Sequence, residues 1–254
     1  MKHLQTRAFV LKTVDYGERD VIVTLLGRDT GRFSAIARSA KTSRKRFAGG
    51  LTTLRCLQAN YTTRRNRDLA TLNEINIIQD YAGIEGHLEK IAAASYATEL
   101  VREMCREADE ASATFDLLES FYDRVARLDF LPGLEVLLRH FELCLLELHG
   151  ASPSLTHCAR CGRSAREMDK LRLTRCGAGL VCSTCRHPGE AVGVIEPETL
   201  ELLHYFRNLD GPTPTGLDLE PVYLQARRVV MHSIHQNLSH PLRSLAMLES
   251  LGLG

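Results

Sequence analysis

Four cysteines in two pairs are the residues of this sequence with the clearest chemistry. Cys158 and Cys161 belong to the segment CARCG, Cys182 and Cys185 belong to LVCSTC, and twenty residues separate the pairs. Two thiolates at C-x2-C spacing turn back on one ion, and two such pairs supply the four sulfurs of a tetrahedral zinc site. The pattern predicts one structural Zn²⁺ ion, and the alternatives are an Fe–S cluster, a redox pair or a site that has lost its metal.

A closed site of four cysteines leaves no open position for a substrate, so we expect it to stabilise the fold rather than to catalyse a reaction. Cys176 lies six residues before Cys182 and is the nearest competing ligand, although its simplest interpretation is a spare thiol at the end of a strand. His157 and His187 flank the pairs and are alternative ligands in place of one cysteine, but we expect both to face solvent. We interpret the remaining cysteines as small apolar residues of the core: Cys56, Cys105 and Cys144.

Three histidines near the end of the chain raise a second metal site as an alternative. His232 and His235 lie three residues apart in a helical pattern, and His240 follows them. No acidic or thiol partner lies at helical spacing beside them, so surface histidines are the simpler interpretation.

The sequence contains none of the common enzyme signatures. It has no G-x-x-x-x-G-K-[ST] phosphate loop, no G-x-G-x-x-G after a strand, no G-x-S-x-G elbow and no H-E-x-x-H. Asp20, Asp29 and Asp68 lie apart at expected strand ends and do not form the pattern of a two-metal nuclease. We therefore expect a protein that is not an enzyme.

The second chemical feature is a region rich in positive charge. Between Thr30 and Arg67 the chain has ten Lys or Arg residues and no Asp or Glu, although the net charge of the whole chain is only +1. Such an imbalance between regions is typical of a protein with a polyanionic partner. Two segments carry most of this charge, RSAKTSRKRFAGG at 38–50 and NYTTRRNRD at 60–68.

The two basic segments suggest a binder of single-stranded nucleic acid, with cations along the phosphates and aromatic rings for the bases. Phe47, Tyr61 and Phe33 are the candidate rings, although Phe47 is equally well explained as a core residue that holds the loop down. A merely solvated loop and a nuclear localisation segment (KTSRKR) are the alternatives. The predicted nucleic-acid-binding side chains are Arg38, Lys41, Arg44, Lys45, Arg46, Arg64, Arg65 and Arg67.

The pattern of apolar runs and turns in residues 1 to about 80 predicts a small β-barrel, which would position these cations. Five short runs rich in β-branched and apolar residues are separated by turn signals, among them Tyr16-Gly17, Asp29-Thr30-Gly31 and Gly49-Gly50. Five strands in about 75 residues suit an OB-fold, which also removes exposed sheet edges. The five runs are RAFVLKTV, RDVIVTLL, RFSAIARS, LRCLQANYTT and LATLNEINII.

The pattern changes to a helical period from about residue 83. The segment PGLEVLLRHFELCLLELHG has apolar residues at three- and four-residue spacing between Pro132 and Gly150, so we expect a central helix there. A cysteine-rich insertion occupies 157–187. We expect further helices at 84–107, 113–129, 196–209 and 219–239, and a short one after Pro241.

The fold class predicted from these patterns is α+β, with a five-stranded OB-fold barrel followed by a helical domain that contains an inserted four-cysteine zinc module. The expected divisions are a barrel at 1–80, helical parts at 81–155 and 189–254, and the zinc module at 156–188. No apolar run approaches the ~20 residues that span a bilayer, and the N-terminus has no apolar signal core. We therefore expect a cytoplasmic, nucleoid-associated protein with no membrane contact.

Taken in order along the chain, these features resemble the bacterial RecO family of recombination mediators. The resemblance is carried by the GE-x-D-x-[IV] hairpin in GERDVIVTLLGRDTGRFSAIA, the basic loop ARSAKTSRKRFAGGLTTL and the downstream CARCG…GAGLVCSTC module. It covers essentially the whole chain, and the order of the three parts is more specific than any one of them.

The resemblance implies an OB domain, a helical bundle and a four-cysteine zinc module. RecO-like proteins bind single- and double-stranded DNA, anneal complementary strands, and work with RecR to load RecA onto DNA covered by single-strand binding protein, whose acidic C-terminal tail they contact. The DNA-contacting role carries over most directly to Arg38, Arg44 and Arg46. Some family members lack the cysteines, so zinc is not required for the shared function.

The sequence therefore predicts a non-enzymatic mediator of DNA repair and recombination. Two other functions remain as alternatives. One is a protein-interaction scaffold in which the zinc module and the helices are the working surface, and the other is a zinc-dependent nucleic-acid enzyme.

Overall fold

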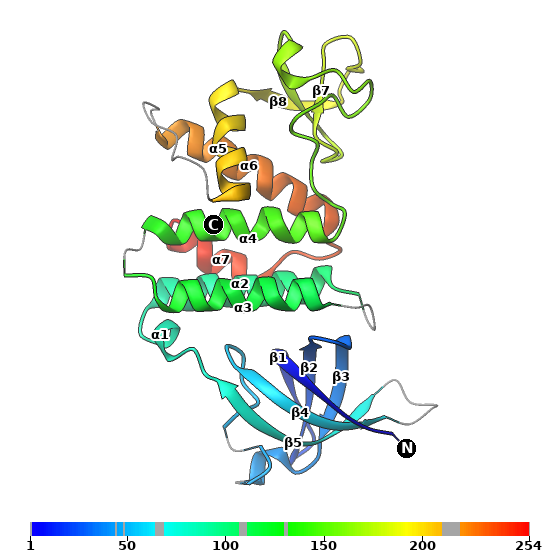
Figure 1. The fold of residues 1–254 in the computed structure, drawn as a ribbon, viewed down its shortest axis with the longest axis vertical. Helices are drawn as coiled ribbons and strands as arrows, with labels where there is room; N and C mark the ends of the chain where they lie inside the picture. The colour runs from blue at the N-terminus through cyan, green and yellow to red at the C-terminus, as the bar shows by residue number, and fades with distance from the viewer. Residues whose placement is uncertain are drawn as a thin grey trace. The chain divides into compact units, whose positions relative to one another are not determined.

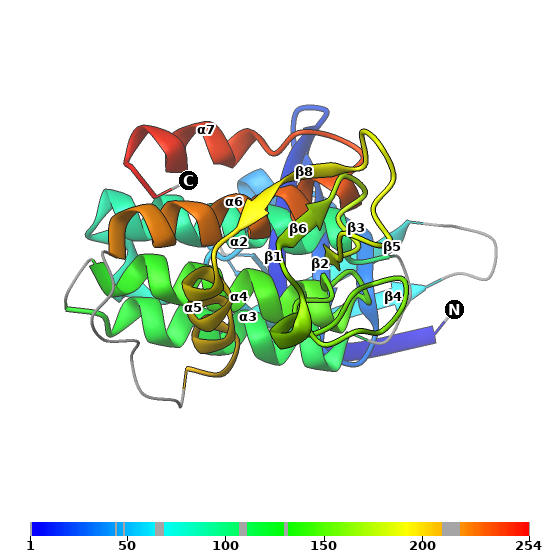
Figure 2. The ribbon, with the colours of Figure 1, turned by 90° about the horizontal axis from the view of Figure 1, so that it is seen from above.

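The computed structural model describes residues 2–43, 45–47, 49–63, 69–106, 111–129, 132–209 and 219–253. The chain forms two compact units, one made of Met1–Leu134 together with Leu242–Gly254 and the other of Glu135–Pro241. The last short helix of the chain therefore belongs to the same unit as the N-terminal strands (Figures 1 and 2).

Five strands near the N-terminus close into a barrel with the order β1-β2-β3-β5-β4. Neighbouring strands are antiparallel except β3 and β5, which pair in parallel through Ala35↔Ala70 to Ala37↔Leu72. This order and closure confirm the predicted OB-fold barrel. The strands are β1 (Lys2–Tyr16), β2 (Asp20–Gly27), β3 (Gly31–Ala37), β4 (Cys56–Thr63) and β5 (Ala70–Gln79).

Period-two alternation builds the barrel core, because every second side chain of a strand points inward. The inward residues Val23 and Leu25 of β2 are fully buried, and so are Ala35 and Ala37 of β3. The register of β1 changes between Val10 and Lys12, where a bulge separates a buried half of the strand from an exposed end.

Helices pack on one end of the barrel within the same unit. The ring of Phe9 on β1 lies 4.7 Å from that of Phe115 and 5.3 Å from that of Tyr122. The Arg28 guanidinium also donates two hydrogen bonds of 2.8 Å to Asp116. The helices of this unit are α1 (Ala82–Glu85), α2 (Leu88–Met104), α3 (Ser112–Ala126) and α7 (Arg243–Ser250).

The second unit combines helices with a small antiparallel sheet of strand order β7-β6-β8. Leu138, Phe141 and Leu145 are fully buried along α4, the helix that was predicted to be central. The elements are α4 (Pro132–Leu148), β6 (Leu171–Thr174), β7 (Leu180–Val181), β8 (Ala191–Ile195), α5 (Pro197–Asn208) and α6 (Leu219–Asn237).

The predicted fold class is confirmed, including the change from strands to helices after the barrel. Neither α1 nor the sheet of the second unit was predicted, apart from a strand that ends near Cys176, where β6 lies. The division of the chain at residues 80, 155 and 188 stays a prediction. Among the described residues, no helix is both long and apolar enough to cross a bilayer.

Candidate functional site

The four paired cysteines come together in the second unit. Their sulfur atoms all lie within 4.8 Å of one another, and those of Cys161 and Cys182 are 3.9 Å apart. A tetrahedral zinc site with bonds of about 2.3 Å has edges of about 3.8 Å, so the cluster has the dimensions of a metal site. Cys158 and Cys182 are buried, Cys185 is half-buried and Cys161 is exposed.

Backbone turns hold the two pairs in position. The N–H of Gly162, which has a positive φ of 72°, donates to the carbonyl of Cys158, and the N–H of Cys185 donates to that of Cys182. Burial raises the pKa of the Cys158 thiol, but N–H groups of Cys161, Cys182 and Arg160 that point at its sulfur lower that pKa to about 6. These amide groups stabilise a thiolate, which is the form that binds metal.

The competing ligands lie outside this cluster. Cys176 is exposed in the turn between β6 and β7, and the exposed His157 forms a 2.9 Å contact with the hydroxyl of Thr156. His232 lies 3.2 Å from the carbonyl of Thr174. In the described part of the chain, the four cysteines form the one group of three or more metal-ligating side chains.

The basic loop follows β3 at the end of the barrel. Its first residues form a 3-10 helix, η1 (Ala40–Thr42), and the side chains of Arg38, Lys41, Lys45 and Arg46 are exposed. Four further predicted DNA contacts lie outside the described residues: Arg44, Arg64, Arg65 and Arg67.

Specific contacts fix the start of the loop against the hairpin of β1 and β2. Ser39 has a left-handed backbone (φ 54°), and its N–H donates to the Asp20 carboxylate at 2.7 Å. The Lys41 ammonium forms an ion pair of 2.9 Å with Asp15 and its backbone N–H donates to the carbonyl of Arg19. The acidic residues of the hairpin therefore hold the cationic loop in place.

The end of the loop is anchored in the barrel. Phe47 is only 3% exposed and belongs to the barrel core, and the carbonyl of Arg46 accepts a hydrogen bond from the N–H of Ile75 on β5. Arg46 also donates to the carbonyl of Arg38 at 2.9 Å, which joins the two ends of the cationic segment. Because both ends are fixed, the loop presents its cations from a defined position.

The proposed role of the aromatic rings needs correction. Phe47 and Tyr61 are both 3% exposed, and the Phe33 ring packs at 4.7 Å against that of Tyr61. Phe47 and Tyr61 therefore belong to the barrel core, and the half-buried Phe33 packs against that core. The interpretation of Phe47 as a core residue that holds the loop is the correct one.

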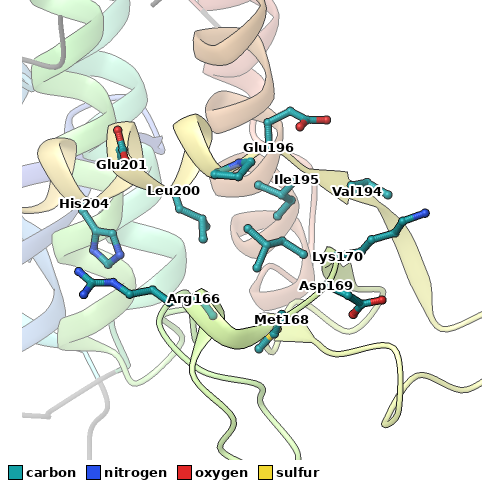
Figure 3. Close-up of a pocket in the computed structure, with 13 residues that line it drawn as sticks. Arg166, Met168, Asp169, Lys170, Val194, Ile195, Glu196, Leu200, Glu201 and His204 are labelled. Atoms are coloured by element: carbon teal, nitrogen blue, oxygen red, sulfur yellow. The ribbon is translucent and has the colours of Figure 1, made fainter.

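A groove of about 900 Å³ lies in the second unit, lined by residues of the 3-10 helix η2 (Ala165–Glu167), β6, β8 and α5. Figure 3 shows its apolar side chains, including Ile195 and Leu200, with the Arg166 and His204 side chains next to one another. Burial lowers the pKa of His204, and the positive charges of Arg207 and Arg166 lower it further.

Two family models together match nearly the whole chain. The model of the family "Recombination protein O N terminal" matches residues 1–81, and that of "Recombination protein O C terminal" matches residues 86–246. The chain belongs to the RecO family. Membership in this family assigns the chain to DNA repair and recombination, as the resemblance had predicted.

Several curated relatives are named DNA repair protein RecO. One from Myxococcus xanthus is 32% identical over the full length of both chains, and one from Pelobacter propionicus is 32% identical over 96% of each. A relative from Anaeromyxobacter dehalogenans is 38% identical over 80% of this chain and 75% of its own length. None of these names refers to a catalytic activity.

Sequence analysis missed the residues of the first hairpin that contact the basic loop. Asp15 was not singled out, and Asp20 was noted only at an expected strand end and within the GE-x-D motif. Tyr16, 55% exposed beside them, was noted only as part of a turn. Their relation to the loop is a long-range contact that the spacing of residues in the sequence does not encode.

Proposed function

We propose that this chain is a DNA recombination mediator that binds single- and double-stranded DNA and anneals complementary strands. With RecR, it would help to load RecA onto DNA covered by single-strand binding protein, whose acidic C-terminal tail it would contact. The observation that supports this proposal most directly is the cationic loop, anchored at both ends to a closed OB-fold barrel. The proposed DNA contacts are the eight predicted above: Arg38, Lys41, Arg44, Lys45, Arg46, Arg64, Arg65 and Arg67.

The mechanism follows from charge neutralisation. Each strand carries one negative charge per nucleotide, and a cation that contacts a phosphate releases a counterion into solution. Exposed Arg38, Lys45 and Arg46 on a fixed loop would lower the repulsion between two strands brought to one surface. No covalent step is needed, so the proposed function is not enzymatic. We propose that Zn²⁺ in the four-cysteine cluster stabilises the second unit and takes no part in chemistry.

The test is the salt dependence of DNA binding, measured by fluorescence anisotropy with a labelled oligonucleotide. The logarithm of the affinity should fall linearly with that of the salt concentration, by about 0.7 for each single-strand phosphate contacted. Charge reversal in the double variant Lys45→Glu, Arg46→Glu should weaken binding and flatten this slope. Reversal of two exposed arginines of the second unit, Arg186→Glu and Arg228→Glu, is the matched control.

The results also separate this function from its two alternatives. A protein-interaction scaffold would not bind the oligonucleotide even at low salt, and loop variants that bind as tightly as the wild type would contradict the proposed contacts. A zinc-dependent nucleic-acid enzyme would cleave or alter the DNA during long incubation. Annealing of complementary strands at two salt concentrations, with and without single-strand binding protein, then tests the mediator activity itself.

A further inference from the structure

The hairpin of β1 and β2 extends beyond the point where the barrel closes. β1 pairs with β4 only as far as Phe9↔Cys56, whereas its pairing with β2 continues to Tyr16↔Asp20. All side chains of residues 12–16 are exposed. The end of this hairpin therefore presents side chains to solvent instead of to the barrel core.

Tyr16 has an unusual environment for an aromatic residue of this chain. It is 55% exposed, and it is the only aromatic among the large exposed apolar side chains of the described residues. Other rings of the barrel, those of Phe9, Phe47 and Tyr61, are 3% exposed or less. Phe33 is half-buried and packs against Tyr61, so among the described rings of the barrel that of Tyr16 is the most exposed.

The pairing of the strands places Tyr16 beside the basic loop. Residues directly opposite in an antiparallel pair project to the same side of the sheet, about 5 Å apart, so Tyr16 and Asp20 share one face. The Asp20 carboxylate accepts the N–H of Ser39, the residue after Arg38. Tyr16 therefore projects from the Asp20 face, which the first residue after Arg38 contacts, whereas Lys41 reaches Asp15 on the opposite face.

The positive charge of this region comes from the basic loop, whereas the hairpin tip carries Asp15, Glu18 and Asp20 against Arg19. Asp15 is in an ion pair with Lys41, and the Asp20 carboxylate already accepts a backbone N–H. The exposed cations Arg38, Lys45 and Arg46 lie on the loop itself. An exposed ring next to a cationic loop, at the first hairpin of an OB-fold, is the combination that binds unpaired bases and their phosphates.

We propose that Tyr16 is a base-stacking residue for single-stranded nucleic acid, with the neighbouring phosphates held by the basic loop. This inference rests on the proposed function and assigns to one residue the preference for unpaired strands. Bases in a duplex are stacked on each other and offer no free face, so Tyr16 contributes to the binding of single strands and little to that of duplexes.

A tryptophan at position 16 gives a direct measurement, because the natural chain contains none. The emission of Tyr16→Trp should be quenched when an unlabelled single strand stacks on the indole, and much less by a duplex of equal length. Leu88→Trp is the matched control, since Leu88 is 54% exposed but lies at the start of α2. Its emission should not respond to either DNA.

Affinity provides the second measurement. Tyr16→Ala should bind a single strand roughly 5- to 150-fold more weakly than the wild type, the range expected for one base stacked on an aromatic ring. Its affinity for a duplex should change less than about twofold, Tyr16→Phe should retain both affinities, and Leu88→Ala should behave as the wild type. Thermal unfolding of each variant shows whether the barrel remains folded.

The outcomes separate this inference from the proposed function. If the wild type binds no DNA at low salt, both are wrong. If binding depends on Lys45 and Arg46 but is unchanged in Tyr16→Ala, and the indole at position 16 is not quenched, only the stacking role is wrong. Equal losses for single strands and duplexes would also overturn it, because they indicate a general defect of the loop.

Discussion

The guanidinium carbon of Arg46 lies 5.0 Å from the centre of the Phe47 ring, although Arg46 is exposed and Phe47 is buried in the barrel core. The exposed cation therefore lies over the buried ring that anchors the loop. This arrangement couples the position of the charged side chain to the packing of the core, because Arg46 cannot move far without losing the contact with the ring.

Phe47→Ala should reduce stability and DNA binding together. Removal of a buried phenylalanine ring leaves a cavity and lowers the free energy of unfolding by about 3–5 kcal/mol. The same change releases the loop, so the affinity for an oligonucleotide should fall even at temperatures where the barrel is folded. Phe47→Leu, which fills most of the volume, is the control and should keep most of both properties. Urea unfolding followed by circular dichroism checks the stability, and an unchanged midpoint for Phe47→Ala would show that the ring is not part of the core.

Asp15→Asn should strengthen DNA binding. The Asp15 carboxylate forms a 2.9 Å ion pair with Lys41, so its removal frees a cation of the basic loop and removes one negative charge. Exposed ion pairs contribute about 0.2–1 kcal/mol, and the affinity for a single strand should rise by a factor of up to about five at low salt. Anisotropy titrations measure this change.

The matched control for that variant is Asp29→Asn, which removes the same charge beyond the other end of β2, where Asp29 lies 3.8 Å from Arg28. It should leave the affinity nearly unchanged. If both variants bind more tightly to the same extent, the effect reflects the net charge of the chain and not the release of Lys41.

The strands of the barrel and the cysteine cluster could be predicted because local patterns encode both. Turn residues and period-two alternation mark each strand, and two C-x2-C pairs are a complete description of a four-sulfur site. β1 nevertheless extends over Lys2–Tyr16, beyond the predicted 7–14. Its two ends pair with different strands, and such long-range pairing lengthens a strand without any signal in its own residues.

The small sheet of the second unit could not be predicted for a related reason. β7 has two residues and β6 has four, which is too short for alternation to be detected. Gly179, with a φ of 120°, pairs with Ser154, and an added Cβ would collide with the Ser154 backbone. The sheet is therefore specified by a close approach of distant segments.

The burial of Phe47 and Tyr61 could not be predicted either. It depends on which side of the barrel wall each ring occupies, and the amino-acid composition of a segment does not determine that side.

Glu99→Gln should weaken the attachment of α7 to α2 at neutral pH. The Glu99 carboxylate accepts the N–H and the hydroxyl of Ser244 at 2.7 and 2.6 Å, and it also accepts from Arg102 at 2.9 Å. Burial raises the pKa of Glu99, but these hydrogen bonds outweigh it and hold the pKa below its usual value. Loss of the charged acceptor should lower the free energy of unfolding by about 1–3 kcal/mol.

The effect of Glu99 should depend on pH with a defined sign. Because the pKa is lower in the folded state, the stabilisation is fully present above the ordinary value of 4.5 and is lost as the pH falls through the lowered pKa. Urea unfolding of wild type and Glu99→Gln should therefore differ at pH 7 and converge in strong acid. Glu103→Gln, which also removes a contact with Arg102 but none with Ser244, is the control and should show a smaller difference. A difference that does not change with pH would exclude the charged carboxylate as its cause.

Removal of metal should unfold the cysteine module and leave the barrel folded. We expect one zinc ion per chain, measured by elemental analysis of the purified protein, and its loss in Cys182→Ser. Hydrogen exchange should then speed up in residues 157–187 while the strands of the barrel stay protected, because metal binding supplies the folding free energy of a small module. Cys176→Ser is the matched control and should keep its zinc, since Cys176 lies outside the cluster. A metal content equal in Cys182→Ser and wild type would show that the ion lies elsewhere.

Hydrogen bonds with Cys161 and Cys182 raise the pKa of Cys185 to about 12, so zinc must displace a proton to bind this sulfur. Zinc affinity should accordingly fall as the pH is lowered, which a zinc titration at two pH values measures.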